Sequence, residues 1–451
     1  MICTALLVSS VLGLQAGGAS PHATPRPAAP TPAAPIDWKK AEAPLLTGHV
    51  QLTFPDMFVK AGENYFDHET PPRWVIFQAI PVPAEGQMPD ANYSMYAARL
   101  ARDAHGEITG IDTPVLLSPP GSSNTCGWFH PKEPFRVLFG STLVPPTATD
   151  TPGYSKDRNR YTWQFPEEMQ IVARSIRPAY DDTVKARGEK VHAGFGVWTE
   201  ANDTPALLVQ RAGGYTAECS WSPDGRFILY THVDPKTRNP NIWVRDTKHG
   251  EADTLLIGET GYNGGPFFSP DGRAIVYRSD RRGDSNLQLF YATLAFDDPA
   301  DPARITGLKR EVALTDNQQV NWAPYFHPRK PYLVYAASEL GHQNYEVFAI
   351  QLPAADVMDA TGTTADAAWP AQRAALRKAR VTQATGFDGL PAFSADGSLM
   401  IFTSQRGKKL EREQRPSSQV WIAKYAGEPA WGWTPPPPPP PAVDAPPGPA
   451  K

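Results

Sequence analysis

Residues 262–283 read YNGGPFFSPDGRAIVYRSDRRG and contain two short β-strands joined by a tight turn. Phe267 and Phe268 end one apolar run, and residues 274–277 begin a second run of the β-branched and aromatic residues that favour strands. Between them, Ser-Pro-Asp-Gly at 269–272 suits a turn, because proline presets φ, aspartate bonds its own backbone and glycine accepts a positive φ. An isolated hairpin is marginally stable, so this unit is expected to pack against copies of itself.

Copies of this hairpin recur along the chain, which predicts a repeat architecture. Close copies of the turn are WSPDG at 221–225 and FSADG at 393–397, and more divergent ones are FHPK at 129–132, FHPR at 326–329 and YFDH at 65–68. A third strand follows the hairpins, most clearly at 241–244, 287–291, 345–350 and 419–423. The sequence therefore contains six copies of one unit.

A fourth short strand decides how the units close. It follows five of the six units, as VLLS at 115–118, LLVQ at 207–210, TLLI at 254–257, VALT at 312–315 and ARVT at 379–382. A sixth copy, VQLT at 50–53, precedes the first unit, and nothing similar follows the last one. The predicted fold is therefore all-β: a six-bladed β-propeller of four-stranded antiparallel blades, with the last blade closed by the N-terminal strand and no long free edges.

The repeat resembles a known family. The pattern PxFSPDGxxIxYxSxRxG is similar to the repeat of TolB-type six-bladed propellers, and the segments of this chain that resemble TolB-like proteins of the bacterial envelope are GENYF (62–66), TCGWFHP (125–131), NGGPFFSPDG (263–272) and NWAPYFHP (321–328). The resemblance covers about residues 46–425. It implies the fold, whereas the functions within the wider family differ: relatives include a Pal-binding periplasmic component, propeller caps of serine peptidases and a lyase of pectin fragments.

Four segments are expected along the chain. Residues 1–19 resemble a secretory signal peptide, with an apolar run too short to span a membrane. Residues 20–45 have the composition of a stiff Pro/Ala-rich linker, and residues 46–426 form the propeller. Residues 427–451, which include seven consecutive prolines, are expected to be a disordered tail. Export to the periplasm or cell envelope without a membrane span follows from this organisation.

Composition sets further limits. With 41% hydrophobic and 20% charged residues the chain can bury a large core, and its net charge of −4 leaves no basic surface of the kind that binds nucleic acid. We expect a monomer. Insertions at 141–166, 178–203 and 354–378 are expected to leave the core unchanged, and the last one is compatible with a short helix.

Two cysteines fall close together in the expected fold. Cys126 and Cys219 lie within one position of each other on the innermost strands of adjacent blades. In an exported protein a disulfide between them is conceivable. The alternative, which we favour, is two buried thiols that pack as small apolar groups.

The innermost strand of each blade lines the channel, so residues that enter these strands form one mouth of it. Polar residues occur at the entry of five strands, and two acids follow at a later position: the candidate site consists of Asn124, Thr216, Asn263, Asn321 and Asp388 together with Glu63 and Glu218. Such a ring could bind a peptide loop, a polar ligand or a cation. The alternative is that these residues cap strand ends and hold water in the channel.

Neither a metal nor another cofactor is expected. His130 and His327 occupy equivalent turns in blades that face each other across the ring, so they cannot share a metal, and His68 lies in the turn of blade 1. The chain has no GxSxG motif and no room for a hydrolase domain. The RGD tripeptide at 282–284 is expected to be a solvated turn.

The sequence thus favours a non-catalytic protein-interaction module of the bacterial cell envelope, with an envelope protein as partner. The more specific form of this prediction is a relation to the Tol-Pal system. The alternative is a channel-mouth site that binds or cleaves an acidic saccharide or a small polar ligand, with or without a divalent cation. The fold does not decide between them.

Overall fold

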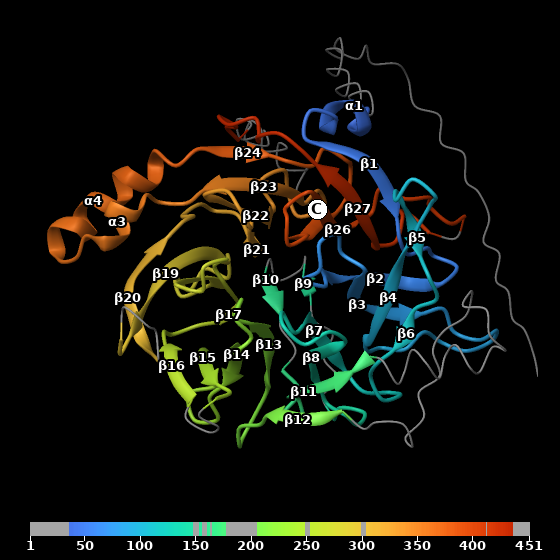
Figure 1. Cartoon of the computed structure of the whole chain (residues 1–451), viewed down its shortest axis with the longest axis horizontal. Helices are drawn as coiled ribbons and strands as arrows, with labels where there is room; N and C mark the ends of the chain where they lie inside the picture. Colours follow the sequence, from blue (N-terminus) through green and yellow to red (C-terminus); the bar gives the residue numbers. More distant parts are fainter. Residues whose placement is uncertain are drawn as a thin grey trace, which may run out of the picture. The chain divides into compact units, whose positions relative to one another are not determined.

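Six antiparallel sheets follow one another around a ring in chain order (Figure 1). The computed structural model describes residues 36–147, 153–155, 160–162, 165–176, 205–248, 253–298, 304–411 and 413–435, with the backbone alone at 153–155 and 160–162. Residues 1–35, and with them the predicted signal peptide, lie outside the described residues. The predicted six-bladed, all-β propeller is confirmed.

The blades have the following strands. Blade 1 contains β2 (Phe58–Phe66), β3 (Trp74–Pro81) and β4 (Ser94–Arg102), with β5 (Ile108–Ile111) and β6 (Val115–Leu116) both pairing with β4. Blade 2 contains β7 (Asn124–Phe129), β8 (Arg136–Ser141), β11 (Gln170–Ser175) and β12 (Ala206–Val209). Blade 3 contains β13 (Thr216–Trp221), β14 (Phe227–Val233), β15 (Pro240–Asp246) and β16 (Asp253–Ile257). Blade 4 contains β17 (Asn263–Phe268), β18 (Ala274–Ser279), β19 (Gln288–Phe296) and β20 (Ile305–Ala313). Blade 5 contains β21 (Asn321–Phe326), β22 (Tyr332–Ala337), β23 (Glu346–Gln351) and β24 (Lys378–Arg380).

Blade 6 is built from both ends of the propeller. Its first three strands are β25 (Asp388–Phe393), β26 (Leu399–Ser404) and β27 (Gln419–Tyr425), and its outer strand is β1 (Leu46–Gln51). Strands β1 and β27 are antiparallel, with Leu46 opposite Tyr425 and Gln51 opposite Trp421. The predicted closure by the N-terminal strand is therefore confirmed, and it leaves no free edge on β27.

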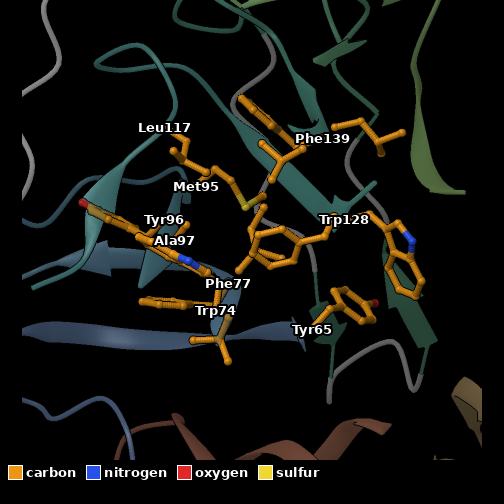
Figure 2. Close-up of a cluster of buried hydrophobic side chains, with 14 of the residues drawn as sticks. Tyr65, Trp74, Phe77, Met95, Tyr96, Ala97, Leu117, Trp128 and Phe139 are labelled. Atoms are coloured by element: carbon orange, nitrogen blue, oxygen red, sulfur yellow. The ribbon is translucent and has the colours of Figure 1, made fainter. Parts of the chain in front are cut away.

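Apolar side chains fill the spaces between neighbouring blades. Phe77 and Met95 of blade 1 meet Phe139 of blade 2 in one buried cluster (Figure 2). All three side chains are fully buried. Successive blades are thus held by apolar burial, worth roughly 1.5–3 kcal/mol for each large side chain.

The turn histidines of blades 2 and 5 serve as structural acceptors. The Nδ1 atom of His130 accepts backbone hydrogen bonds from the amides of Lys132 (3.1 Å) and Glu133 (2.9 Å), and the Nδ1 atom of His327 accepts one from Arg329 (3.1 Å). In the Ser-Pro-Asp-Gly turns, the aspartate carboxylate and the serine hydroxyl accept later amides, four and five positions after the serine. Histidine and serine thus both bond the turn backbone, through different amides.

The first and third insertions carry secondary structure. Strands β9 (Gly153–Ser155) and β10 (Arg160–Thr162) form a hairpin in the first insertion, and the second insertion lies outside the described residues. The third carries α3 (Ala355–Asp359) and α4 (Thr363–Ala374), as the sequence suggested, and buries Trp369 against Val312 of β20.

Two segments assigned to the linker and the tail contact the propeller. Helix α1 (Trp38–Glu42) buries the side chain of Glu42. At the other end, Trp431 lies against Tyr332 of blade 5 with ring centroids 5.5 Å apart, and Trp433 lies against Phe348 at 4.8 Å. The amides of Gly432 and Trp433 both donate to the Lys378 carbonyl of β24. Residues 436–451 lie outside the described residues.

Candidate functional site

The innermost strands of all six blades carry a β-bulge at the same position. Strand pairing shifts register there in each blade, and the residue concerned has a positive φ between 47° and 57°. These six residues, which we call the bulge ring, are Glu63, Cys126, Glu218, Gly265, Ala323 and Leu390. All six line one small cavity, the chamber, so each blade contributes one residue to the wall of the channel.

An aromatic plug fills the channel on the turn side of the chamber. It consists of Tyr65, Trp128, Phe267 and Tyr325, two positions beyond the bulge ring. The rings of Tyr65 and Phe267, from opposite blades 1 and 4, have centroids 5.8 Å apart, and those of Trp128 and Tyr325, from opposite blades 2 and 5, are 6.0 Å apart. Figure 2 shows Tyr65 and Trp128 side by side. Because opposite blades touch here, the rings meet near the axis and close the channel.

The chamber contains a buried network centred on Glu218. The Glu218 carboxylate accepts hydrogen bonds from the Tyr262 hydroxyl (2.7 Å) and the Gly265 amide (2.6 Å), and it lies 3.5 Å from a guanidinium nitrogen of Arg278. Arg278 also donates to the Tyr262 hydroxyl at 2.8 Å. Glu218 and Arg278 are 7% and 9% exposed, so this charge pair is compensated inside the protein rather than by water.

Glu63 occupies the equivalent place in blade 1 and has neutral partners. Its carboxylate accepts from the Cys126 thiol (2.8 Å) and the Thr125 hydroxyl (3.1 Å). Burial raises the pKa of Glu63, and burial together with the neighbouring Glu63 raises the pKa of the Cys126 thiol well above its ordinary value. Cys126 is therefore a hydrogen-bond donor and a poor nucleophile. Cys126 and Cys219 are free cysteines.

The other five predicted site residues begin innermost strands and are at most 3% exposed. Asn263 Nδ2 donates to the Glu259 carbonyl (2.7 Å), Asn124 Nδ2 to the Tyr93 carbonyl (2.9 Å) and Asn321 Nδ2 to the Asn317 side chain (2.8 Å). Thr216 bonds His232 at 3.0 Å, and Asp388 pairs with Arg406 at 2.7 Å. These side chains tie connecting loops to strand ends, while Glu63 and Glu218 alone of the seven line the chamber.

Sequence reasoning missed Arg278, Tyr262 and three aromatic residues at the mouth. Phe165, from the blade 2 insertion, has its ring centroid 5.0 Å from that of Tyr215 and 6.2 Å from that of Tyr262. Trp322 and Phe387 are 6.2 Å apart. All three, which we call the mouth patch, are half-buried and pack on one apolar cluster. The paired glycines before Phe267 were the only sequence signal for this network: Gly265 leaves space for the Arg278 guanidinium, and Gly264 for the side chains of Glu218 and Tyr262.

Comparison with known proteins supports the family resemblance. The Tol-Pal system protein TolB of Nitratidesulfovibrio vulgaris is 29% identical to this chain over 122 residues, which are 27% of this chain and 24% of that protein. In this part of its sequence and in its six-bladed fold, the chain resembles TolB-type propellers. An uncharacterised protein of Agrobacterium fabrum is 29% identical over 134 residues, 30% of this chain and 39% of that protein. The TolB-like chain thus spans well under half the length of either relative.

A solved structure and family models complete the comparison. The structure of a putative TolB from Agrobacterium tumefaciens aligns over 81% of the TolB-like chain and 91% of its own, with 13% identity and a TM-score of 0.42. No protein-family model matches the TolB-like chain.

Within the described residues of the TolB-like chain, no group of three or more His, Cys, Asp and Glu side chains is arranged to hold a metal ion. No helix in the described part is long and apolar enough to cross a membrane.

Proposed function

We propose that this TolB-like propeller is a non-catalytic protein-interaction module of the bacterial cell envelope, exported to the periplasm, with one envelope protein as partner. The observation that carries the proposal is the sequence relationship to TolB, whose name assigns it to the Tol-Pal system. A role in a Tol-Pal system is the more specific form of the same proposal.

The channel mouth is the face we propose for the partner. The aromatic plug closes the channel on the turn side, so a partner segment can enter only from the mouth and cannot pass through. The mouth patch offers half-buried aromatic side chains, which are enriched where protein interfaces derive most of their binding energy. In this proposal Asn124, Thr216, Asn263, Asn321 and Asp388 shape the loops around the mouth, while Glu63 and Glu218 face an inserted group.

Site-specific cross-linking tests this proposal. A photoreactive phenylalanine analogue is placed at position 165 or 387 of the mouth patch, and at position 255 as a control, because Leu255 is 44% exposed on the outer strand of blade 3. After irradiation in envelope extract of the source organism, we expect one protein to be cross-linked from positions 165 and 387 and not from 255. Cross-linking of the same protein from all three positions, or of none from the mouth, would contradict the proposed face.

A further inference from the structure

A second cavity lies on blade 3, apart from the chamber. It is a cleft of about 770 Å³ between β12 of blade 2, the connection that enters blade 3, and strands β14, β15 and β16. The residues that matter for its chemistry are Leu207, Arg211, His232, Trp243, Arg245 and Asp253. None of them lines the chamber, so the cleft is a separate candidate site.

Arg211 is held rigidly in this cleft. Its guanidinium carbon lies 3.8 Å from the ring centroid of Trp243, and its Nη1 atom donates to Asp253 (2.9 Å) and to the Tyr230 hydroxyl (3.3 Å). The side chain is nevertheless 26% exposed. A ligand that met this guanidinium would find it already ordered, which lowers the entropy cost of binding.

The floor of the cleft holds two guanidinium groups and one carboxylate, and a second carboxylate lies at its rim, so the charges of the described lining residues balance. Arg245 donates to both oxygens of Asp253, at 2.7 and 2.9 Å, so one carboxylate serves two guanidinium groups. The other carboxylate, Asp234, accepts the amides of Lys236 (2.9 Å) and Thr237 (2.8 Å) in its own turn at the rim. His232 is buried, and burial lowers its pKa, so it adds no charge at neutral pH.

An apolar lip borders the charged floor. Leu207, on the outer strand of blade 2, is 51% exposed and lines the same cleft. Exposed leucine beside an ordered guanidinium suits a ligand that has an anionic group on an apolar or ring-shaped body.

We propose that this cleft binds a small oxyanion-bearing ligand, a carboxylate or a phosphate, whose anionic group is bound by Arg211 and whose body packs on Leu207. Guanidinium groups form strong, directional hydrogen bonds with both kinds of oxyanion. The site is independent of the partner proposed for the channel mouth.

Calorimetric titration at low ionic strength tests the proposal, with inorganic phosphate and glucuronate as probes and glucose as a neutral control. The full chain is compared with Arg211→Gln, with Leu207→Asp, which changes only an exposed side chain, and with the matched control Leu255→Asp, outside the cleft. We expect at least one anion to bind the unaltered chain. Its affinity should be about tenfold or more lower for Arg211→Gln, which loses a charge-assisted hydrogen bond, and for Leu207→Asp, which adds a repulsive charge. Leu255→Asp should bind as the unaltered chain does.

The probes also separate the two sources of the anion. Binding of phosphate alone supports a phosphate or phosphomonoester ligand, and binding of glucuronate alone supports a carboxylate ligand. The proposal is overturned if neither anion binds at concentrations up to about 10 mM, which corresponds to a binding free energy of roughly −3 kcal/mol. It is also overturned if glucose binds as well as the anions, or if Leu207→Asp and Arg211→Gln leave binding unchanged.

Discussion

The guanidinium of Arg406 lies 2.9 Å from the carboxylate of Glu42, although 364 positions separate the two residues in the sequence. Arg406 also pairs with Asp388 at 2.7 Å, and the Nε2 atom of His49 lies 2.8 Å from the Glu42 carboxylate. The side chains of Arg406 and Glu42 are both 0% exposed. Helix α1 is thereby fixed to blade 6 beside the strand that closes the ring.

Removing Glu42 should strongly destabilise the propeller. Glu42→Ala leaves the buried Arg406 with one carboxylate fewer, and breaking a buried pair in this way costs about 3–5 kcal/mol. Denaturant unfolding followed by circular dichroism measures the change. The control is Glu69→Ala, which removes an ion pair to Arg73 in which both side chains are about half exposed and should cost under about 1 kcal/mol. Equal losses of unfolding free energy in the two variants would show that the buried network stabilises the propeller no more than an exposed ion pair does.

Ring closure makes a second prediction. Deleting residues 1–55 removes β1 and leaves β27 with an unpaired edge, so we expect loss of the cooperative unfolding transition. Deleting residues 436–451 keeps Trp431 and Trp433, which contact blade 5, so the transition should persist. Calorimetry of both truncations checks this, and a cooperative transition in the first would refute the role of β1.

The turn histidines predict a loss of stability in acid. Burial lowers the pKa of His68 and His327 from 6.5 to about 4. Between these values the unfolded chain binds more protons than the folded one, so stability falls as the pH falls, by up to about 1.4 kcal/mol per pH unit for each histidine. In the double variant His68→Gln, His327→Asn, the glutamine keeps a donor for the Phe129 carbonyl and the asparagine keeps an acceptor for the Arg329 amide. Neither side chain takes up a proton between pH 7 and pH 5. Unfolding at pH 7 and pH 5 should show a smaller decrease in the variant than in the unaltered chain.

The thiols make a fourth prediction. Burial raises the pKa of both Cys126 and Cys219 well above the ordinary value, so alkylation by iodoacetamide at pH 8 should be slow in the folded chain and fast after unfolding. Mass spectrometry of material from an oxidising compartment, digested without reductant, distinguishes free thiols from a bridge. A linked Cys126–Cys219 peptide would contradict the free-thiol arrangement.

The sequence was sufficient for the blades because turn chemistry and strand alternation are local signals that recur six times. It was insufficient for the site. Position in the repeat was enough to place Asn263 and Asp388 at the start of innermost strands. Whether their side chains face solvent or a neighbouring loop depends on contacts such as Asn263 with Glu259 and Asp388 with Arg406. Long-range packing likewise decided that Trp431 contacts blade 5, a contact that composition could not reveal.

Gly265 offers a direct test of the chamber. A Cβ atom there would lie 2.4 Å from Nη1 of Arg278, and the backbone has φ of +57°. Gly283 is the matched control, since its φ is +77° and nothing lies within 4 Å of the added atom. Both alanine substitutions should cost about 1 kcal/mol for the left-handed backbone, but Gly265→Ala should cost roughly 1–3 kcal/mol more because the buried guanidinium must move. Comparing their unfolding free energies isolates the second contribution, and equal values would mean that Arg278 can leave Glu218 without penalty.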